Sequence, residues 1–125
     1  MSLRLDYKSH GEYLQVYVTG SYVFNDALSM LPEKFMKCRN LNISSALIDF
    51  TEMKGEPMAT QKALFGIAIE REYIKHLDLG GEALKVALVG SSVTSFEPAL
   101  NIVTATNLTF NLLSNREDAL KWLGV

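Results

Sequence analysis

Two short, almost entirely apolar runs constrain the fold of this chain more than any other feature of its sequence. They are residues 46–50, Ala-Leu-Ile-Asp-Phe, and residues 85–89, Lys-Val-Ala-Leu-Val. A strand that is exposed on one face alternates apolar and polar residues, whereas a strand covered on both faces is apolar nearly throughout. The two runs therefore predict inner strands of a parallel sheet that lie side by side, joined by a helical crossover.

The segments around these runs supply the remaining elements. Strict alternation of Leu14, Val16 and Val18 predicts a strand over 13–19, with a hairpin partner over 3–8. Apolar residues at helical spacing, together with a last strand-like run, predict helices over 26–39, 58–77, 96–107 and 116–123 and a strand over 109–113. The order β-β-α-β-α-β-α-β-α predicts an α/β fold: a mostly parallel, mixed five-stranded sheet with an N-terminal β-hairpin and about four helices.

Local residues refine where two of these helices begin. Asn25 has the chemistry of an N-cap for the first helix, and Pro32 inside that helix predicts a kink or a division into two short helices. Ser114 and Glu117 have the spacing of a capping box, which would start the last helix.

Size and composition exclude several classes of protein. The 125 residues are 48% hydrophobic and 21% charged, which predicts one globular domain over 1–125. The net charge is −2 and the basic residues are scattered, so we expect no nucleic-acid partner. Cys38 is the only cysteine, which favours a reducing, cytoplasmic location, and no apolar run is long enough for an integral membrane segment.

Catalytic and cofactor motifs are missing from the sequence. There is no Gly-x-Ser-x-Gly elbow, no Walker pattern and no Gly-x-Gly-x-x-Gly run. The two histidines, His10 and His76, have no cysteine or histidine at metal-ligand spacing. We therefore expect neither an enzyme nor a bound metal or cofactor.

Two loops follow the carboxyl ends of the inner strands, where ligands gather in open α/β sheets. The loop over 51–57 contains Glu56 and Pro57, and the loop over 90–94 contains Ser91 and Ser92. Backbone N–H groups and hydroxyls in the second loop would suit an anion, and helix capping is the alternative use of the same hydroxyls.

The helix over 58–77 is apolar on more than one side. One side, expected to face the sheet, contains Glu70 among Ala63, Gly66, Ile67, Tyr73, Ile74 and Leu77. A carboxylate there would be desolvated unless the helix overhangs the sheet and lets it reach water. The opposite side contains Leu64, Phe65, Ala68 and Ile69, which calls for cover by a neighbouring helix, a second subunit or an apolar ligand.

Four stretches in order give the chain a family resemblance. They are residues 18–20, Val-Thr-Gly; 47–51, Leu-Ile-Asp-Phe-Thr; 85–89, Lys-Val-Ala-Leu-Val; and 117–123, Glu-Asp-Ala-Leu-Lys-Trp-Leu. Together they resemble the STAS domain, the fold of SpoIIAA-type anti-sigma-factor antagonists, and its SpoIIAA-like, SEC14/CRAL-TRIO-related cousins. Those antagonists carry a phosphorylatable serine in an Asp-Ser-Ser-Gly-like turn. Residues 52–60 contain no serine here, and Thr60 is the nearest hydroxyl, so the phospho-switch is not carried over.

The leading hypothesis is a non-enzymatic STAS-like regulatory or protein-interaction module that works as a homodimer or with a protein partner. Its expected surface is the patch Leu64, Phe65, Ala68 and Ile69, with the loop over 52–57 beside it, so that Phe65→Asp should alter association and leave the fold intact. The alternative is a SEC14-like binding protein for a small apolar or amphiphilic ligand. That ligand would lie between the long helix and the sheet, with Glu70 or the Ser91-Ser92 loop fixing its polar head.

Overall fold

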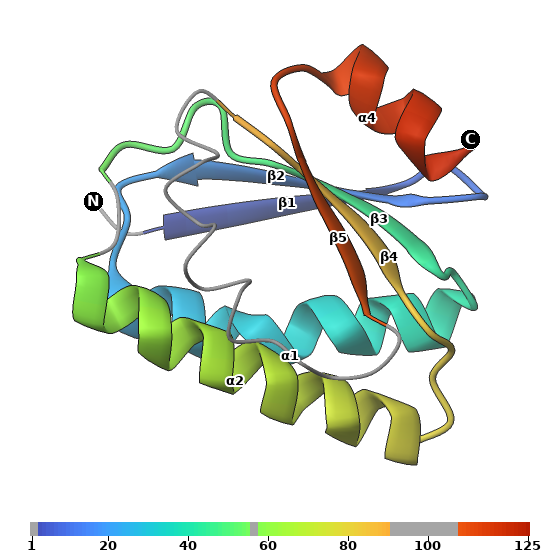
Figure 1. Cartoon of the computed structure of the whole chain (residues 1–125), viewed down its shortest axis with the longest axis horizontal. Coiled ribbons are helices and arrows are strands. Elements are labelled where there is room, and N and C mark those ends of the chain that lie inside the picture. The colour runs from blue at the N-terminus through green and yellow to red at the C-terminus, as the bar shows by residue number, and fades with distance from the viewer. Residues whose placement is uncertain (1–2, 56–57, 91–107) are drawn as a thin grey trace.

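A computed structural model describes residues 3–55, 58–90 and 108–125 of the chain. Its elements are β1 (Leu3–Ser9), β2 (Leu14–Gly20), α1 (Phe24–Leu41), β3 (Ser45–Asp49), α2 (Ala59–Asp78), β4 (Lys85–Val89), β5 (Thr109–Leu113) and α4 (Arg116–Leu123). Helices α1 and α2 lie together on one face of a twisted sheet, and α4 lies on the other face (Figure 1). The described part of the chain thus has three layers, helix, sheet and helix.

The sheet has the predicted mixed topology. Its five strands lie in the order β1-β2-β3-β4-β5, with β1 antiparallel to β2 and every other neighbouring pair parallel. Leu47 and Ala87, at the centres of the two apolar runs, are register partners, and both are completely buried. This confirms that the two runs are inner strands lying side by side.

Burial on two faces explains why β3 and β4 are so apolar. Ala46 of β3 and Val86 of β4 face a core formed with α1 and α2. The residues that follow them, Leu47 and Ala87, face a second core formed with Ala119 of α4. Successive strand residues point to opposite faces, so the middle positions of a strand between two helical layers are all buried and favour apolar side chains. The polar residues Ser45, Asp49 and Lys85 lie at the strand ends.

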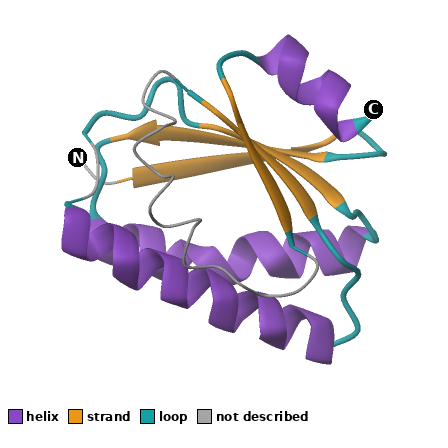
Figure 2. Cartoon of the chain, in the orientation of Figure 1, coloured by secondary structure: helices purple, strands orange, loops and turns teal. Residues whose placement is uncertain are grey.

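Helix α1 differs from its prediction at both its start and its middle. It begins at Phe24 after Val23, which provides no side-chain cap, so the prediction of Asn25 as the N-cap is wrong. It continues without interruption past Pro32, and Figure 2 draws one helix rather than two. Pro32 is exposed, so the carbonyl that loses its helical partner lies on the side where water can replace the hydrogen bond.

Helix α4 has its predicted bounds but a different cap. The Asn115 side chain accepts a hydrogen bond from the Asp118 backbone N–H at 2.9 Å. Ser114 and Glu117 therefore do not form the expected capping box, because the capping residue lies one position later. Three helices fall in the described ranges, and the fourth predicted helix, over 96–107, lies outside them. In those same ranges no helix has both the length and the hydropathy needed to cross a bilayer.

Candidate ligand-binding cavity

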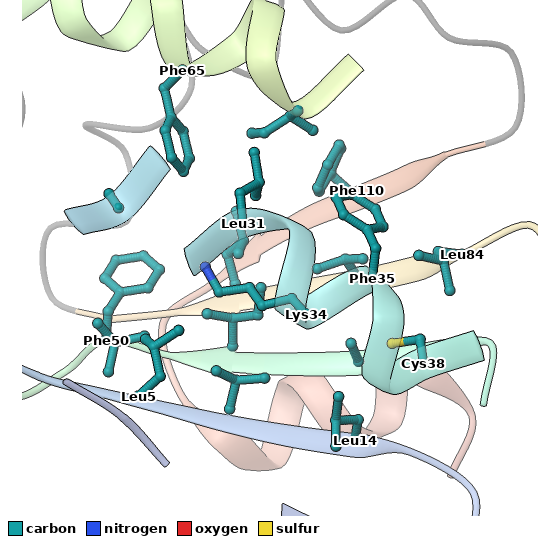
Figure 3. Close-up of a pocket in the computed structure, with 18 of the residues that line it drawn as sticks. Leu5, Leu14, Leu31, Lys34, Phe35, Cys38, Phe50, Phe65, Leu84 and Phe110 are labelled. Atoms are coloured by element: carbon teal, nitrogen blue, oxygen red, sulfur yellow. The ribbon is translucent and has the colours of Figure 1, made fainter. Parts of the chain in front are cut away.

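An apolar cavity of about 120 Å³ lies between the sheet and helices α1 and α2 (Figure 3). The sheet contributes every second residue of its inner strands, because these side chains share one face. The helices contribute residues three or four positions apart. The wall includes Leu14, Val16, Ile48, Val86, Leu88 and Phe110 from the sheet, Leu31, Phe35 and Cys38 from α1, and Phe65 and Ile69 from α2.

Lys34 places a cationic group in this apolar wall. It lies on α1 three residues after Leu31 and four before Cys38, which puts it on the inward stripe of the helix. Figure 3 draws its nitrogen among the side chains that line the cavity. Burial lowers the pKa of Lys34 to about 8, and the neighbouring Glu33 carboxylate opposes part of that change. Among the described residues, the amine has no hydrogen-bond or ion-pair partner.

Two further polar groups belong to the same wall. The Tyr22 hydroxyl is buried without a hydrogen-bond partner in the described ranges, and burial raises the pKa of this side chain. The Cys38 thiol is buried as well, and desolvation raises its pKa to about 11, an effect that Arg39 partly opposes. A neutral, buried thiol behaves as a small apolar side chain, so the groups available to a ligand's polar end are Lys34 and Tyr22.

Two loops that contribute residues to the cavity wall are hydrogen-bonded to each other. The backbone N–H of Tyr22 donates to the Lys54 carbonyl at 2.8 Å, and the N–H of Lys54 donates to the Gly20 carbonyl at 2.8 Å. These bonds tie the segment after β3 to the segment after β2. Tyr22 and Met53, which line the cavity, are thereby fixed relative to each other.

The apolar patch expected on α2 does not form as a single exposed surface. Phe65 and Ile69 line the cavity, and Ala68 is half-buried against the same core. Leu64 alone of the four is exposed, at 53%. Of the three kinds of cover that the sequence left open, the structure favours cover within the chain, because Phe65, Ala68 and Ile69 pack in the core shared with α1 and the sheet.

The side of α2 expected to face the sheet is also shifted. Ile67 and Ile74 are 46% and 49% exposed, whereas Tyr73 and His76 are buried. Glu70 is half-buried and has an interaction partner. The buried face thus follows Ile69, Tyr73 and His76, because the helix is rotated about its axis relative to the sequence prediction.

The other predicted site residues are not brought to the cavity by the described structure. Thr60 is exposed in the first turn of α2. Glu56, Pro57, Ser91 and Ser92 lie outside the described residues, so their expected binding roles stay predictions.

His76 is a buried side chain whose role the sequence did not indicate. Its Nε2 donates to the Glu82 carbonyl at 2.9 Å, and Arg39 donates to its Nδ1 at 3.2 Å. The ring lies so close to Gly81 that an added Cβ would come within 2.5 Å of it. These contacts join α1, α2 and the turn before β4, so His76 is a structural residue, and the described part of the chain holds no cluster of metal-ligating side chains.

Lys34 and Tyr22 are the site residues that sequence reasoning missed. Lys34 carried a detectable signal, since a lysine interrupts the stripe between Leu31 and Cys38. Tyr22 carried none, because its position depends on how the loop after β2 meets the loop after β3.

Comparisons with known proteins identify the fold. No protein-family model matches the sequence, and no curated protein matches it. An uncharacterized DUF3478-family protein from Shewanella loihica PV-4 with a SpoIIAA-like fold is similar over 98% of this chain and 93% of its own, with 22% identity and a TM-score of 0.53. The anti-sigma factor antagonist SpoIIAA, in its unphosphorylated form, is similar over 98% of this chain and 97% of its own, with 9% identity and a TM-score of 0.57.

The chain therefore has a SpoIIAA-like α/β fold. This agrees with the resemblance carried by the four sequence stretches. At these identities the likeness establishes architecture, and function has to be argued from the site.

Proposed function

We propose that this chain is a non-enzymatic STAS-like binding module that holds a small apolar or amphiphilic ligand between the sheet and helices α1 and α2. The observation that carries the proposal is the apolar cavity of about 120 Å³. Protein interiors contain few voids larger than a water molecule. An apolar cavity of roughly 150 Å³ accepts benzene, so the space suits an apolar group of about that size.

An empty cavity of this kind would weaken the fold. At about 24 cal/mol per Å³, a void of about 120 Å³ costs on the order of 3 kcal/mol. That is a large fraction of the stability of a small domain. A bound ligand would restore the missing contacts, which supports binding over a purely structural role for the space.

Native mass spectrometry of the purified chain, before and after solvent extraction, tests this function. We expect a mass adduct that extraction removes, and we expect the extracted chain to take up 1-octanol. Ala27→Leu, which adds carbons to the cavity wall, should lose both. Ala63→Leu, a matched change on α2 outside the wall, should keep both. Failure of the wild type to show either an adduct or octanol uptake would contradict the proposal.

The second candidate function is a protein-interaction module, as a homodimer or with another protein. Leu64, Ile67 and Ile74 form an exposed apolar stripe along the outward face of α2, and such faces favour protein contacts. SpoIIAA, which has the same fold, is an anti-sigma factor antagonist, and this favours a regulatory role. Residues 52–60 contain no serine, so the proposed regulation would work without the serine switch. The single buried thiol, Cys38, is consistent with a cytoplasmic location.

A further inference from the structure

We propose that the ligand of this cavity is a monocarboxylate whose head group is held by the Lys34 amine and whose apolar body has about six carbons. The inference rests on the proposed ligand-binding function and specifies the charge and size of the ligand.

The charge of the Lys34 amine favours a ligand with a negatively charged head group. Lys34 is the only charged residue among the described residues that line the cavity, and the rest of that wall is apolar apart from Tyr22 and Cys38. An ammonium group in apolar surroundings is unfavourable unless an opposite charge and hydrogen bonds compensate for it. The Glu33 carboxylate supplies part of the opposite charge, but in the described ranges the amine makes no ion pair or hydrogen bond. A ligand carboxylate would supply both the charge and the acceptor.

Lys34 lies on the inward side of α1, although outward positions could also hold a lysine. Neighbouring α1 residues such as Glu33 and Met36 are exposed, so polar positions on the outward side were available. Lys34 instead lies on the inward stripe and lines the cavity. The lowered pKa of about 8 still leaves the amine mostly protonated at neutral pH, so it presents a positive charge to an incoming ligand.

The hydroxyl of Tyr22 is buried without a hydrogen-bond partner in the described ranges, and Tyr22 lines the same cavity. A buried hydroxyl without a partner is unfavourable and is rare in folded proteins. A carboxylate has two oxygens, each able to accept hydrogen bonds. A carboxylate bound in the cavity would therefore add acceptors to a wall that contains two donors, the Lys34 amine and the Tyr22 hydroxyl.

The volume of the cavity limits the size of the ligand. A cavity of about 120 Å³ is slightly smaller than an apolar cavity that accepts benzene. A diacyl lipid would not fit within it. A short alkyl or aromatic monocarboxylate would, with its apolar body against Leu31, Val86 and Leu88 and its head toward Lys34.

Calorimetric titration with octanoate, 1-octanol and octylamine tests the inference, because these probes share one alkyl chain and differ in head group. We expect octanoate to bind at least tenfold more tightly than octanol, and octylamine to show no measurable binding. In Lys34→Met the octanoate affinity should fall to that of octanol, while octanol binding stays. Lys37→Met removes the same charge from the same helix. The Lys37 amine lies over the Tyr7 ring at 4.7 Å and does not line the cavity, so this variant should keep the preference.

The outcomes separate the inference from the function on which it rests. Equal binding of octanoate and octanol by the wild type, or an unchanged preference in Lys34→Met, would overturn the carboxylate assignment and leave a neutral-ligand site. Binding of none of the three probes would overturn the ligand-binding function itself. The comparison of head groups on the wild type needs no variant, so it decides the question even where Lys34→Met does not fold.

Discussion

At the scale of single residues, the buried Lys34 amine lowers the free energy of unfolding of the ligand-free protein, and the proposed binding role would explain why it is there. Its pKa falls from 10.5 to about 8 on folding, chiefly through burial. Each unit of such a change corresponds to about 1.4 kcal/mol, and water that reaches the half-buried side chain reduces the effect. Residues at binding sites often lower stability in exchange for function. An inward-facing lysine that destabilises the ligand-free fold agrees with this pattern.

We therefore expect Lys34→Met to raise the free energy of unfolding at pH 7 by about 1–3 kcal/mol. The unfolded chain binds the Lys34 proton more tightly than the folded chain, so the stability of the wild type rises with pH between about 8 and 10.5. The advantage of the variant should be full below pH 8 and should shrink towards zero near pH 10.5. Urea unfolding across this range measures it, with Lys37→Met as the control. A destabilised Lys34→Met at pH 7 would contradict this account.

His76 gives a second prediction at the scale of single residues, which concerns stability at acidic pH. Burial lowers the pKa of His76 from 6.5, and the positive charge of Arg39 adds to the effect while the bond to the Glu82 carbonyl opposes it. The folded state thus favours the neutral ring, whereas the unfolded chain binds a proton below pH 6.5. Stability from this group is present above pH 6.5 and is lost as the pH falls through the lowered value.

Urea unfolding of the wild type and His76→Gln at pH 7.5 and pH 5 tests this dependence. We expect the variant to be less stable at pH 7.5, because the packing against Phe35 and Tyr73 is lost. We also expect it to lose less stability between the two pH values than the wild type does. Identical losses in both proteins would show that other groups set the acid sensitivity.

At the scale of elements, two asparagines near the starts of helices play different parts. Asn115 caps α4 through its bond from the Asp118 N–H, whereas Asn25 lies inside the first turn of α1 and provides no cap. The residue before each helix is extended, but it is Val23 at α1, which has no polar side-chain atom, and Asn115 itself at α4.

Asn115→Ala should therefore lower the free energy of unfolding by about 1 kcal/mol, and Asn25→Ala should change it by less than about 0.5 kcal/mol. Urea titrations of both variants beside the wild type measure the pair. Equal effects of the two substitutions would mean that the cap assignment is wrong at one of the helices.

At the scale of the whole molecule, the outward face of α2 is the surface through which we propose that copies of the chain associate. Phe65→Asp is not a clean probe of that face, because Phe65 lines the cavity and a carboxylate there would be buried in the core. Ile67 is 46% exposed on the outward stripe and provides the better position.

If α2 forms the proposed dimer contact, wild-type chains should scatter light as a species heavier than the 13.9 kDa monomer, and Ile67→Asp should return them to monomer mass. Met36→Asp, at an exposed position on α1, should leave the mass of the associated species unchanged. Both variants should keep the wild-type circular dichroism spectrum, which shows that each is folded. A monomeric wild type at high concentration would remove the self-association hypothesis.

The amino-acid sequence by itself determined the sheet and the order of its elements. Leu47 and Ala87 lie in runs that are almost entirely apolar, and Leu14, Val16 and Val18 alternate with period two. These patterns are local. A strand covered on both faces is apolar nearly throughout, and a strand covered on one face alternates apolar and polar residues. The bounds of β4, β5 and α4 followed from them without reference to distant contacts.

Only the tertiary structure decided which face of α2 is buried and where the cavity lies. The first half of α2 is apolar nearly all round, so its periodicity does not distinguish a buried Ile69 from a buried Ile67. The direction of Lys34 depends on how α1 packs against the sheet, and the surroundings of Tyr22 depend on a loop contact with Lys54. The position of a side chain within a core is set by neighbours far away in the sequence, and a short window of sequence does not contain them.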